Sequence, residues 1–274
     1  MTQQPVLVTS ALPYVNNIPH LGNIVGSTLS ADVYTRFLRL QGKKVFYLCG
    51  SDEYGTTTEV KAKAEKLSCR EICDRYHQIH RDVYDWFNIQ FDVYGRTSTS
   101  TQTSTTHEIF FDLLRNRHIE SRTIDQMYCN SCEMFLADRY LQGYCYFDSC
   151  RDLKKIANGD QCDGCGNLMD CFKFSDYWCL VCHQKPEIRQ TKHLYLKLAD
   201  FKADLIKYFL ESDIRLTSNA RAITQAFLNQ ELESRCITRD LRWGTPVPSN
   251  QEFKQYLDEN GFESNNSINL DEFK

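Results

Sequence analysis

Eight cysteines stand in four close pairs between residues 129 and 182, and this spacing constrains the fold of the stretch more than any other feature of the chain. Two thiolates on one tight turn can reach a common zinc ion at about 2.3 Å, and a second such turn completes its four ligands. The sequence therefore predicts two zinc sites, built from these pairs: Cys129 and Cys132, Cys145 and Cys150, Cys162 and Cys165, Cys179 and Cys182. The wider spacing of Cys145 and Cys150 makes that pair the least regular.

A closed site of four thiolates leaves no coordination position for a substrate, so the predicted zinc ions are structural. The alternative is that some of these cysteines are small buried residues without a metal. The density of the cluster favours metal, because disulfides are rare in the cytosol and its thiols stay reduced. The remaining cysteines are interpreted as core or incidental thiols: Cys49, Cys69, Cys73, Cys171 and Cys236.

The bulk composition excludes several classes of protein. Hydrophobic residues make up 42% and charged residues 25% of the chain, which is ordinary for a globular protein. A net charge of -4 and a pI near 6.0 give no overall attraction to nucleic acid or anionic lipid, so an RNA contact needs a local basic patch. The first five residues lack the features of a signal peptide, and no apolar run is long enough to span a membrane. We therefore expect a cytoplasmic protein without membrane contact.

Strands alternate with helices in the first third of the chain. Short β-prone runs at 5–10, 45–49 and 91–94 are separated by helical patterns at 20–41, 57–67 and 70–86. This alternation predicts βαβ units and hence an α/β fold with a Rossmann-type, doubly wound parallel sheet. The cysteine-rich stretch is expected to be a zinc-knuckle module inserted into that fold.

The pattern is less regular after residue 96. The polar stretch 97–106 is expected to be a loop that leads to a helix at 107–117. Strands are expected at 193–198 and 235–241, with helices near 201–209 and 218–229 between them. From residue 249 onward the chain is rich in Asn, Glu, Asp and Ser and shows no core pattern.

The short segment Pro19-His20-Leu21-Gly22-Asn23 follows a predicted strand and opens a predicted helix. Doubly wound folds bind nucleotides at this place, because the free N–H groups of a helix start favour phosphate. Gly22 lets a purine lie against bare backbone, and His20 can donate hydrogen bonds to phosphate oxygens. The alternative is that His20 is only a helix cap or a surface residue.

Several blocks together carry a resemblance to a known family. They are VTSALPYVNNIPHLGN (8–23), LCGSDEYGT (48–56), FLADRY (135–140), GDQC (159–162) and CITRDLRWG (236–244). In this order and spacing they resemble methionyl-tRNA synthetases of the eukaryotic cytosolic and archaeal-like type, which are class I aminoacyl-tRNA synthetases. The resemblance covers residues 6–248 and implies the N-terminal part of the catalytic domain.

The resemblance implies an ATP site at the start of the first helix. His20 and Asn23 match the catalytic signature that holds the phosphates of ATP, which binds with Mg²⁺, and Gly22 matches the glycine on the adenine side. Asn23 stands where many class I enzymes have a second histidine, a change that the eukaryotic methionine enzymes share.

The resemblance also implies a methionine pocket. Ala11, Leu12 and Tyr14 match residues of that pocket, and Asp52 matches the carboxylate that pairs with the methionine ammonium group. The local sequence Gly50-Ser51-Asp52-Glu53 allows an alternative, in which Asp52 caps the helix that follows.

The division of the cysteines into two sites comes from the resemblance alone. It implies an inner site of Cys145, Cys150, Cys162 and Cys165, and an outer site of Cys129, Cys132, Cys179 and Cys182. It also implies the domain limits: residues 1–118 as the first half of a Rossmann nucleotide-binding domain, 119–235 as an inserted connective domain with zinc knuckles at about 127–183, 236–248 as the start of the second Rossmann half, and 249–274 as a polar tail.

The family's lysine-containing loop (KMSKS) and its helical anticodon-binding domain have no match in these residues. The leading hypothesis is a methionine-tRNA ligase, which acts on methionine, ATP and the acceptor end of tRNA(Met), with activity impaired because the KMSKS loop and the anticodon-binding domain are absent. The alternative hypothesis is a catalytically inactive, zinc-stabilised binding protein derived from the same fold. A protein partner, or a separate chain that supplies the missing half, would suit the exposed sheet edge expected here.

Overall fold

A computed structural model describes residues 4–263 and 266–273. The chain divides into two compact units: Met1–Thr105 with Leu241–Thr245, and Thr106–Asp240 with Pro246–Lys274. Part of the stretch on which the signal-peptide prediction rests, residues 1–3, lies outside the described residues.

The first unit is built on a parallel sheet of three strands. Strand β1 (Val6–Thr9) pairs with β2 (Val45–Ser51), and β2 pairs with β3 (Val93–Arg96), in the order β1-β2-β3. Because the strands are parallel, their carboxyl ends meet at one edge, where open α/β sheets bind ligands. The α/β fold with the start of a Rossmann-type sheet is therefore confirmed.

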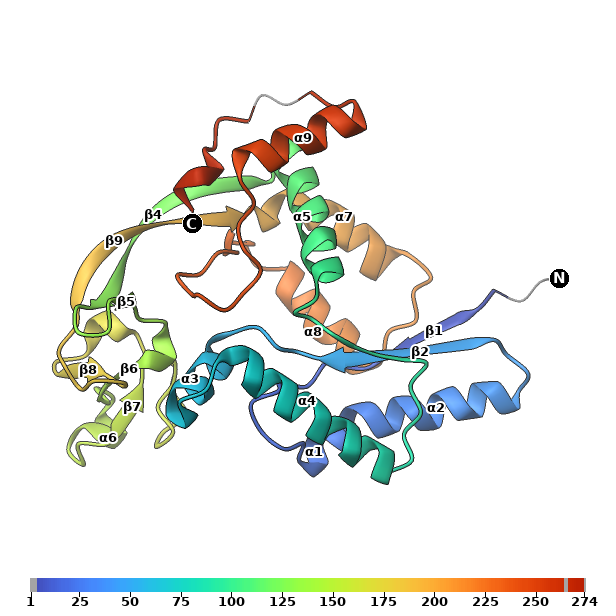
Figure 1. Ribbon diagram of the computed structural model, residues 1–274, viewed down its shortest axis with the longest axis horizontal. Coiled ribbons are helices and arrows are strands. Elements are labelled where there is room, and N and C mark those ends of the chain that lie inside the picture. The colour runs from blue at the N-terminus through green and yellow to red at the C-terminus, as the bar shows by residue number, and fades with distance from the viewer. Residues whose placement is uncertain (1–3, 264–265, 274) are drawn as a thin grey trace. The chain divides into compact units, whose positions relative to one another are not determined.

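Helices connect these strands and cover one face of the sheet. A continuous helical segment follows β1 and comprises α1 (Leu21–Asn23), the π-helical turn η1 (Ile24–Thr28) and α2 (Leu29–Leu40). Between β2 and β3 come α3 (Thr56–Glu65) and α4 (Cys69–Trp86). Helices α2 and α4 run along the same side of the sheet (Figure 1). The core beneath them is apolar and aromatic: Val8, Ile24, Leu38, Tyr47, Cys49, Tyr84 and Ile89.

The strands bury alternate residues, as expected for a sheet with one covered face. Val8 and Tyr47 are buried, whereas Leu7 is 62% exposed and its register partner Phe46 is 45% exposed. Leu48, 37% exposed, lies on the same side of its strand as Phe46. Parallel sheets are usually covered on both faces, so these apolar side chains form a surface that favours association.

Two glycines face each other where β2 and β3 come close. A Cβ added to Gly50 would lie 2.8 Å from the carbonyl oxygen of Gly95, a backbone atom that cannot move aside. We expect Gly50→Ala to lower the free energy of unfolding by about 1–3 kcal/mol, measured by chemical denaturation. Gly26→Ala is the control, because a Cβ at Gly26 has no neighbour within 4 Å. Equal stability of the two variants would contradict the steric argument.

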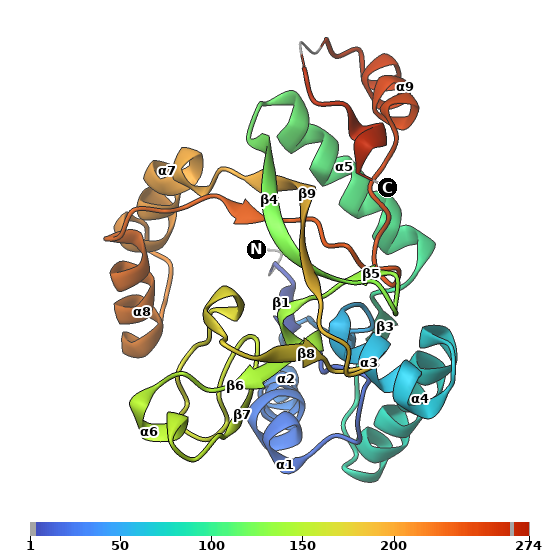
Figure 2. The same cartoon turned by 90° about the vertical axis from the view of Figure 1, so that its left-hand side faces the viewer.

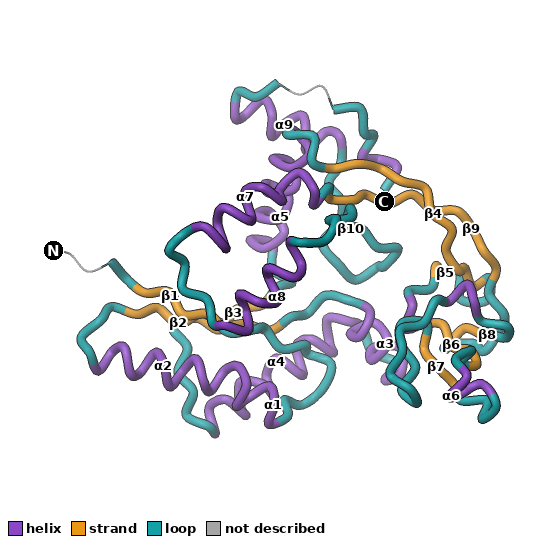
Figure 3. The backbone as a smooth tube through the Cα atoms, turned by 180° about the vertical axis from the view of Figure 1, so that it is seen from behind, coloured by secondary structure: helices purple, strands orange, loops and turns teal. Residues whose placement is uncertain are grey.

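The second unit contains two antiparallel sheets. The larger has the order β10-β9-β4-β5, and the smaller the order β7-β6-β8. Strands β4 and β9 form a long curved ribbon (Figure 2), paired from Ile119 with Leu196 to Tyr128 with Glu187. The strands are β4 (Ile119–Cys129), β5 (Met134–Phe135), β6 (Leu141–Tyr144), β7 (Ile156–Asn158), β8 (Tyr177–Cys179), β9 (Glu187–Leu196) and β10 (Arg235–Cys236). Strands β6, β7 and β8 lie at the end of the ribbon where β5 joins it (Figure 3).

The helices of the second unit are mostly short. The α-helices are α5 (Ser100–Arg115), α6 (Asp148–Arg151), α7 (Lys202–Ile206), α8 (Ser218–Leu228) and α9 (Asn250–Asn260). The 3₁₀ and π turns are η2 (Asp138–Tyr140), η3 (Cys171–Lys173), η4 (Leu198–Phe201), η5 (Lys207–Glu211) and η6 (Leu270–Glu272). Helix α5 carries the chain from the first unit into the second.

Two sequence-based expectations about element limits were wrong. The polar stretch 97–106 is largely helical, because α5 begins at Ser100 with Thr99 Oγ1 accepting a hydrogen bond from the N–H of Gln102 at 3.2 Å. The strand expected at 235–241 ends at Cys236. Beyond it the side chain of Thr238, and not its backbone, accepts the hydrogen bond of the β9 residue Leu194 at 3.0 Å, so the regular ladder stops there.

The polar segment from Ser249 folds, although its sequence showed no core pattern. Ser249 caps α9 in a capping box with Glu252, and the helix ends at the left-handed residue Gly261. Phe253 and Leu270 are buried in a core of the second unit: Phe111, Leu114, Ile119, Leu194, Phe253 and Leu270. A few large apolar residues, widely spaced, anchor this segment, which composition alone did not reveal.

Among the described residues, no helix combines the length and apolar character needed to cross a membrane.

Candidate functional site

The expected methionine-binding residues gather at the carboxyl ends of β1 and β2. Asp52, directly after β2, forms a parallel bridge with Tyr14. The N–H of Asp52 donates to the carbonyl of Pro13 at 2.9 Å, and the carbonyl of Asp52 accepts from Val15 at 3.2 Å. Residues 13–15 and the backbone of Asp52 therefore lie side by side.

The remaining pocket residues lie on the same segment. The carbonyl of Ala11 accepts a hydrogen bond from the hydroxyl of Ser27 at 3.2 Å, which ties it to the helical segment after β1. Leu12 is 44% exposed and Tyr14 is 56% exposed, so within the described residues they line an open edge.

The alternative interpretation, in which Asp52 caps the helix that follows it, is wrong. Helix α3 begins at Thr56 with Gly55 at its N-cap, three residues beyond Asp52, and this cap makes no side-chain hydrogen bond. Burial raises the pKa of the Asp52 carboxyl group, and the neighbouring Glu53 raises it further. A half-buried carboxylate without a cationic partner in the described residues suits an ammonium ligand.

His20 occupies the N-cap of α1, as the alternative interpretation of this residue predicted. Its Nδ1 accepts a hydrogen bond from the N–H of Gly22 at 3.0 Å, and Asn23 Oδ1 accepts from the N–H of His20 at 3.2 Å. With Nδ1 occupied as an acceptor, the neutral ring carries its proton on Nε2. A Cβ at Gly22 would lie 2.9 Å from His20 Cε1, so glycine makes room for the exposed ring.

The loop before His20 is anchored by a buried histidine that the sequence did not single out. His80 of α4 is 1% exposed, and its Nε2 lies 2.8 Å from the carbonyl oxygen of Asn17. Burial lowers the pKa of His80, so the ring is neutral and donates to this carbonyl. The contact fixes the path of the chain from Val15 to His20.

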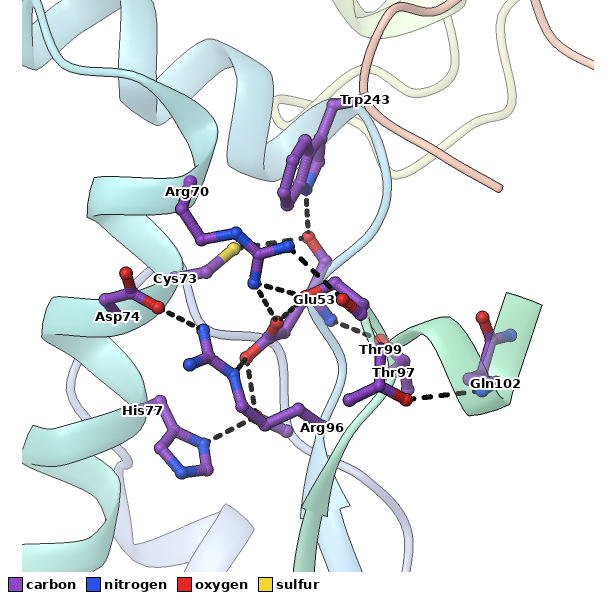
Figure 4. Close-up of polar contacts among 12 residues, drawn as sticks. Glu53, Arg70, Cys73, Asp74, His77, Arg96, Thr97, Thr99, Gln102 and Trp243 are labelled. Atoms are coloured by element: carbon purple, nitrogen blue, oxygen red, sulfur yellow. Dashed lines mark hydrogen bonds and ion pairs between the residues drawn. The ribbon is translucent and has the colours of Figure 1, made fainter. Parts of the chain in front are cut away.

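A second feature that sequence reasoning missed is the fully buried Glu53, next to Asp52 (Figure 4). Arg96 of β3 forms an ion pair with it at 2.6 Å. The hydroxyl of Ser51 donates to the same carboxylate at 3.0 Å and lies 2.8 Å from His77 Nδ1. The only signal in the sequence was the position of Glu53 beside a predicted strand end.

In the second unit, the eight paired cysteines form two groups of four: Cys129, Cys132, Cys179 and Cys182, and Cys145, Cys150, Cys162 and Cys165. The sulfur atoms of each group all lie within 4.8 Å of one another. These are the two sets that the family resemblance implied.

The sulfur–sulfur distances fit a four-coordinate ion. Across the first group, Cys129 lies 3.3 Å from Cys182, and Cys132 lies 3.9 Å from Cys179. In the second group, two such distances are 3.9 and 4.0 Å. A tetrahedral zinc site with bonds of about 2.3 Å has sulfur atoms about 3.8 Å apart. Both groups can therefore hold a metal ion.

The same backbone turn recurs in the three pairs with C-x2-C spacing. The residue after the second cysteine has a positive φ in each: 52° at Glu133, 74° at Gly166 and 59° at His183. The N–H of Gly166 donates to the carbonyl of Cys162 at 2.7 Å, and that of His183 to Cys179 at 2.9 Å. This recurrent turn brings the two sulfur atoms of a pair within reach of one ion.

Backbone N–H groups also favour the thiolate form at two of these cysteines. A hydrogen bond from Asn167 lowers the pKa of Cys165 to about 6, and one from Gln184 lowers the pKa of Cys182 to about 7. The thiolate is the form that binds zinc, so these turns are prepared for a cation.

Comparisons with known proteins identify the class. The profile of the family described as tRNA synthetases class I (M) matches residues 6–257, and the chain belongs to this family. The resemblance to methionyl-tRNA synthetases is confirmed by its relatives. The chain is 52% identical over 248 residues to the methionine–tRNA ligase of Acanthamoeba polyphaga mimivirus and 49% identical over 245 residues to the cytoplasmic enzyme of Arabidopsis thaliana.

The chain is shorter than these relatives. The matched regions cover 90% and 89% of the chain but 45% of the mimivirus protein and 30% of the Arabidopsis protein. Among solved structures, Mycobacterium tuberculosis methionyl-tRNA synthetase in complex with methionyl-adenylate has a TM-score of 0.65 at 18% identity. That match covers 98% of the chain and 49% of the M. tuberculosis chain, and it supports the fold.

Proposed function

We propose that the chain carries the amino-acid activation site of a methionine-tRNA ligase. The reaction joins methionine and ATP into methionyl-adenylate with release of pyrophosphate, and then transfers the methionyl group to the acceptor end of tRNA(Met). The observation that supports it best is the backbone pairing of Asp52 with residues 13–15 at the sheet edge, on the segment that leads to α1 and its N-cap His20. The substrates are proposed from the names of the relatives, which are methionine–tRNA ligases. The cytoplasm is proposed as the location because the Arabidopsis relative is a cytoplasmic enzyme.

In this proposal Asp52 binds the ammonium group of methionine. The carboxylate is half-buried, so its attraction to a cation is stronger than at a fully exposed site. Ala11, Leu12 and Tyr14 line the amino-acid side of the pocket, and the bridge between Tyr14 and Asp52 holds the two sides together.

ATP, with Mg²⁺, binds at the start of α1. His20 Nε2–H donates to a phosphate oxygen, which gains charge as pyrophosphate leaves. Gly22 gives the nucleotide access to the backbone, and Asn23 fixes the N-cap through its hydrogen bond to His20. His20 and Asn23 are thus the proposed catalytic residues of this chain.

Zinc is proposed for both cysteine groups, with the inner ion held by Cys145, Cys150, Cys162 and Cys165, and the outer ion by Cys129, Cys132, Cys179 and Cys182. When bound, zinc supplies charge neutralisation and cross-linking to the module. All four thiolates of each group are used, so these sites brace the fold and take no part in activation.

Methionine-dependent exchange of pyrophosphate into ATP tests the proposal. We expect exchange from the purified 274-residue chain that requires methionine and is lost in His20→Ala, because His20 is the proposed phosphate donor. A full-length relative provides the reference rate. Folded, zinc-loaded protein that binds neither methionine nor ATP would contradict the proposal and favour the alternative of a zinc-stabilised binding protein.

A further inference from the structure

We propose that Glu53 is a positioning residue for Asp52: its buried carboxylate fixes the end of β2 so that the Asp52 carboxylate is held for the ammonium group of methionine. The role rests on the methionine site proposed above. Glu53 itself touches no substrate in this arrangement, and it acts through its neighbour.

The Glu53 carboxylate ties together three elements of the first unit. The side chain is 0% exposed, so its charge needs partners inside the fold. Arg96 Nε lies 2.6 Å from one carboxylate oxygen, and Arg70 Nη1 lies 3.7 Å from the other. Ser51 donates to the first oxygen at 3.0 Å, and Ser98 donates to the second. These partners come from the end of β2, the end of β3 with the loop that follows it, and the start of α4 (Figure 4).

The backbone of Glu53 is held on both sides. Its N–H donates to Thr97 Oγ1 at 2.9 Å, and its carbonyl accepts from Trp243 Nε1 at 2.6 Å and from Cys73 Sγ at 3.5 Å. The guanidinium of Arg70 also lies 5.1 Å from the ring of Trp243, a cation–π contact. Both peptide groups that flank the Glu53 Cα are therefore fixed, and one of them is shared with Asp52.

Asp52 and Glu53 anchor the end of β2 to different segments of the first unit. The Asp52 backbone bonds to Pro13 and Val15 around the pocket segment, while Glu53 bonds to β3 and α4. Neutralising Glu53 would leave Arg96 with one acidic partner, Asp74, and would weaken the side-chain contacts that join the strand end to β3 and α4. The start of α1 is anchored separately by the contact between His80 and Asn17. Loss of Glu53 should therefore disturb methionine binding and spare ATP binding.

The test compares Glu53→Gln with Asp92→Asn in the full chain. Asp92 is a matched control, because its carboxylate also joins β2 to an arginine. It accepts from the N–H of Tyr47 at 2.6 Å and pairs with Arg39 at 2.7 Å, but it lies directly before the start of β3, away from the site. Methionine and ATP affinities are measured by titration calorimetry, zinc content by metal analysis, and backbone protection at residues 48–56 by hydrogen exchange.

We expect Glu53→Gln to weaken methionine binding about tenfold or more, as small displacements at a positioned group can. ATP affinity and zinc content should stay unchanged, and hydrogen exchange at residues 48–56 should speed up. Asp92→Asn should keep both affinities. Equal losses of methionine and ATP affinity in Glu53→Gln, or unchanged protection at 48–56, would overturn the positioning role. Absence of methionine binding by the unmodified chain would instead contradict the proposed function. Hydrogen exchange at residues 48–56 would still decide whether Glu53 holds the strand end.

Discussion

Removal of zinc is expected to unfold the cysteine module between residues 127 and 183. The small sheet β7-β6-β8 has only short strands, and five of the buried residues of the module are cysteines: Cys129, Cys145, Cys150, Cys162 and Cys179. Structural zinc sites contribute about 10–16 kcal/mol of apparent binding free energy in small zinc-finger peptides, and there this binding energy is the folding energy. A module of this kind cannot replace that contribution with apolar packing.

The measurement starts with metal analysis of the purified chain, which should give close to two zinc ions. Cys132→Ser should remove the outer ion and Cys165→Ser the inner ion, each leaving about one per chain, because three ligands bind far more weakly than four. Cys171→Ser is the matched control, since Cys171 lies in the same module but outside both groups. Hydrogen exchange should report lost protection around each missing ion.

Two results would contradict the metal interpretation. Folded protein without metal, with the module still protected from exchange, would show that the cysteines are ordinary core residues. Loss of zinc from Cys171→Ser equal to that from Cys165→Ser would show that the two groups of four are assigned wrongly.

Most of the first unit could be predicted from the sequence, because its signals are local. Apolar runs and helical periodicity place β2 and α4 within two residues of their observed limits, and the segment 20–41 is helical from Leu21 to Leu40. The long ribbon of β4 and β9 was missed over most of its length. Its strands contain runs of consecutive exposed and mostly polar residues, 121–123 in β4 and 187–190 in β9, so no alternation marks them, and each is stabilised by pairing with a partner far away in the sequence.

The features of the candidate site also differ in whether local sequence or distant contacts determine them. The four cysteine pairs follow from spacing, because a knuckle is a local turn, but their division into two groups of four came from the family resemblance. The roles of His20 and Asp52 depended on family resemblance, and their surroundings depended on tertiary structure. Glu53 and His80 gain their importance from burial, and their partners, Arg96 and Asn17, are more than 40 residues away. No pattern in a single sequence connects such pairs.

Substitution of Asp52 by Asn is expected to weaken methionine binding strongly and to stabilise the fold at neutral pH. A hydrogen bond to a charged group is worth about 1.5–3 kcal/mol, so loss of the charge should weaken methionine binding roughly 10- to 100-fold. The same substitution should raise the free energy of unfolding at neutral pH. The folded-state pKa of Asp52 is raised above its ordinary value of 3.8, first by burial and then by Glu53. Ionisation at neutral pH therefore destabilises the folded state, and the uncharged amide of the Asp52→Asn variant avoids this cost.

The pH dependence separates these two effects. In the unmodified chain, methionine affinity should fall as the pH drops through the raised pKa of Asp52, because only the carboxylate attracts the ammonium group. The destabilisation by Asp52 is complete above that pKa and vanishes below the ordinary value, so the gain in melting temperature of Asp52→Asn should shrink as the pH is lowered. Calorimetric titration with methionine and thermal unfolding across a range from about pH 4 to about pH 8 measure both. ATP affinity should not change, since His20 and Gly22 lie on a separate segment. Unchanged methionine affinity in Asp52→Asn would remove Asp52 from the pocket, and a lower melting temperature at neutral pH would mean that its carboxylate stabilises the strand end instead of costing stability there.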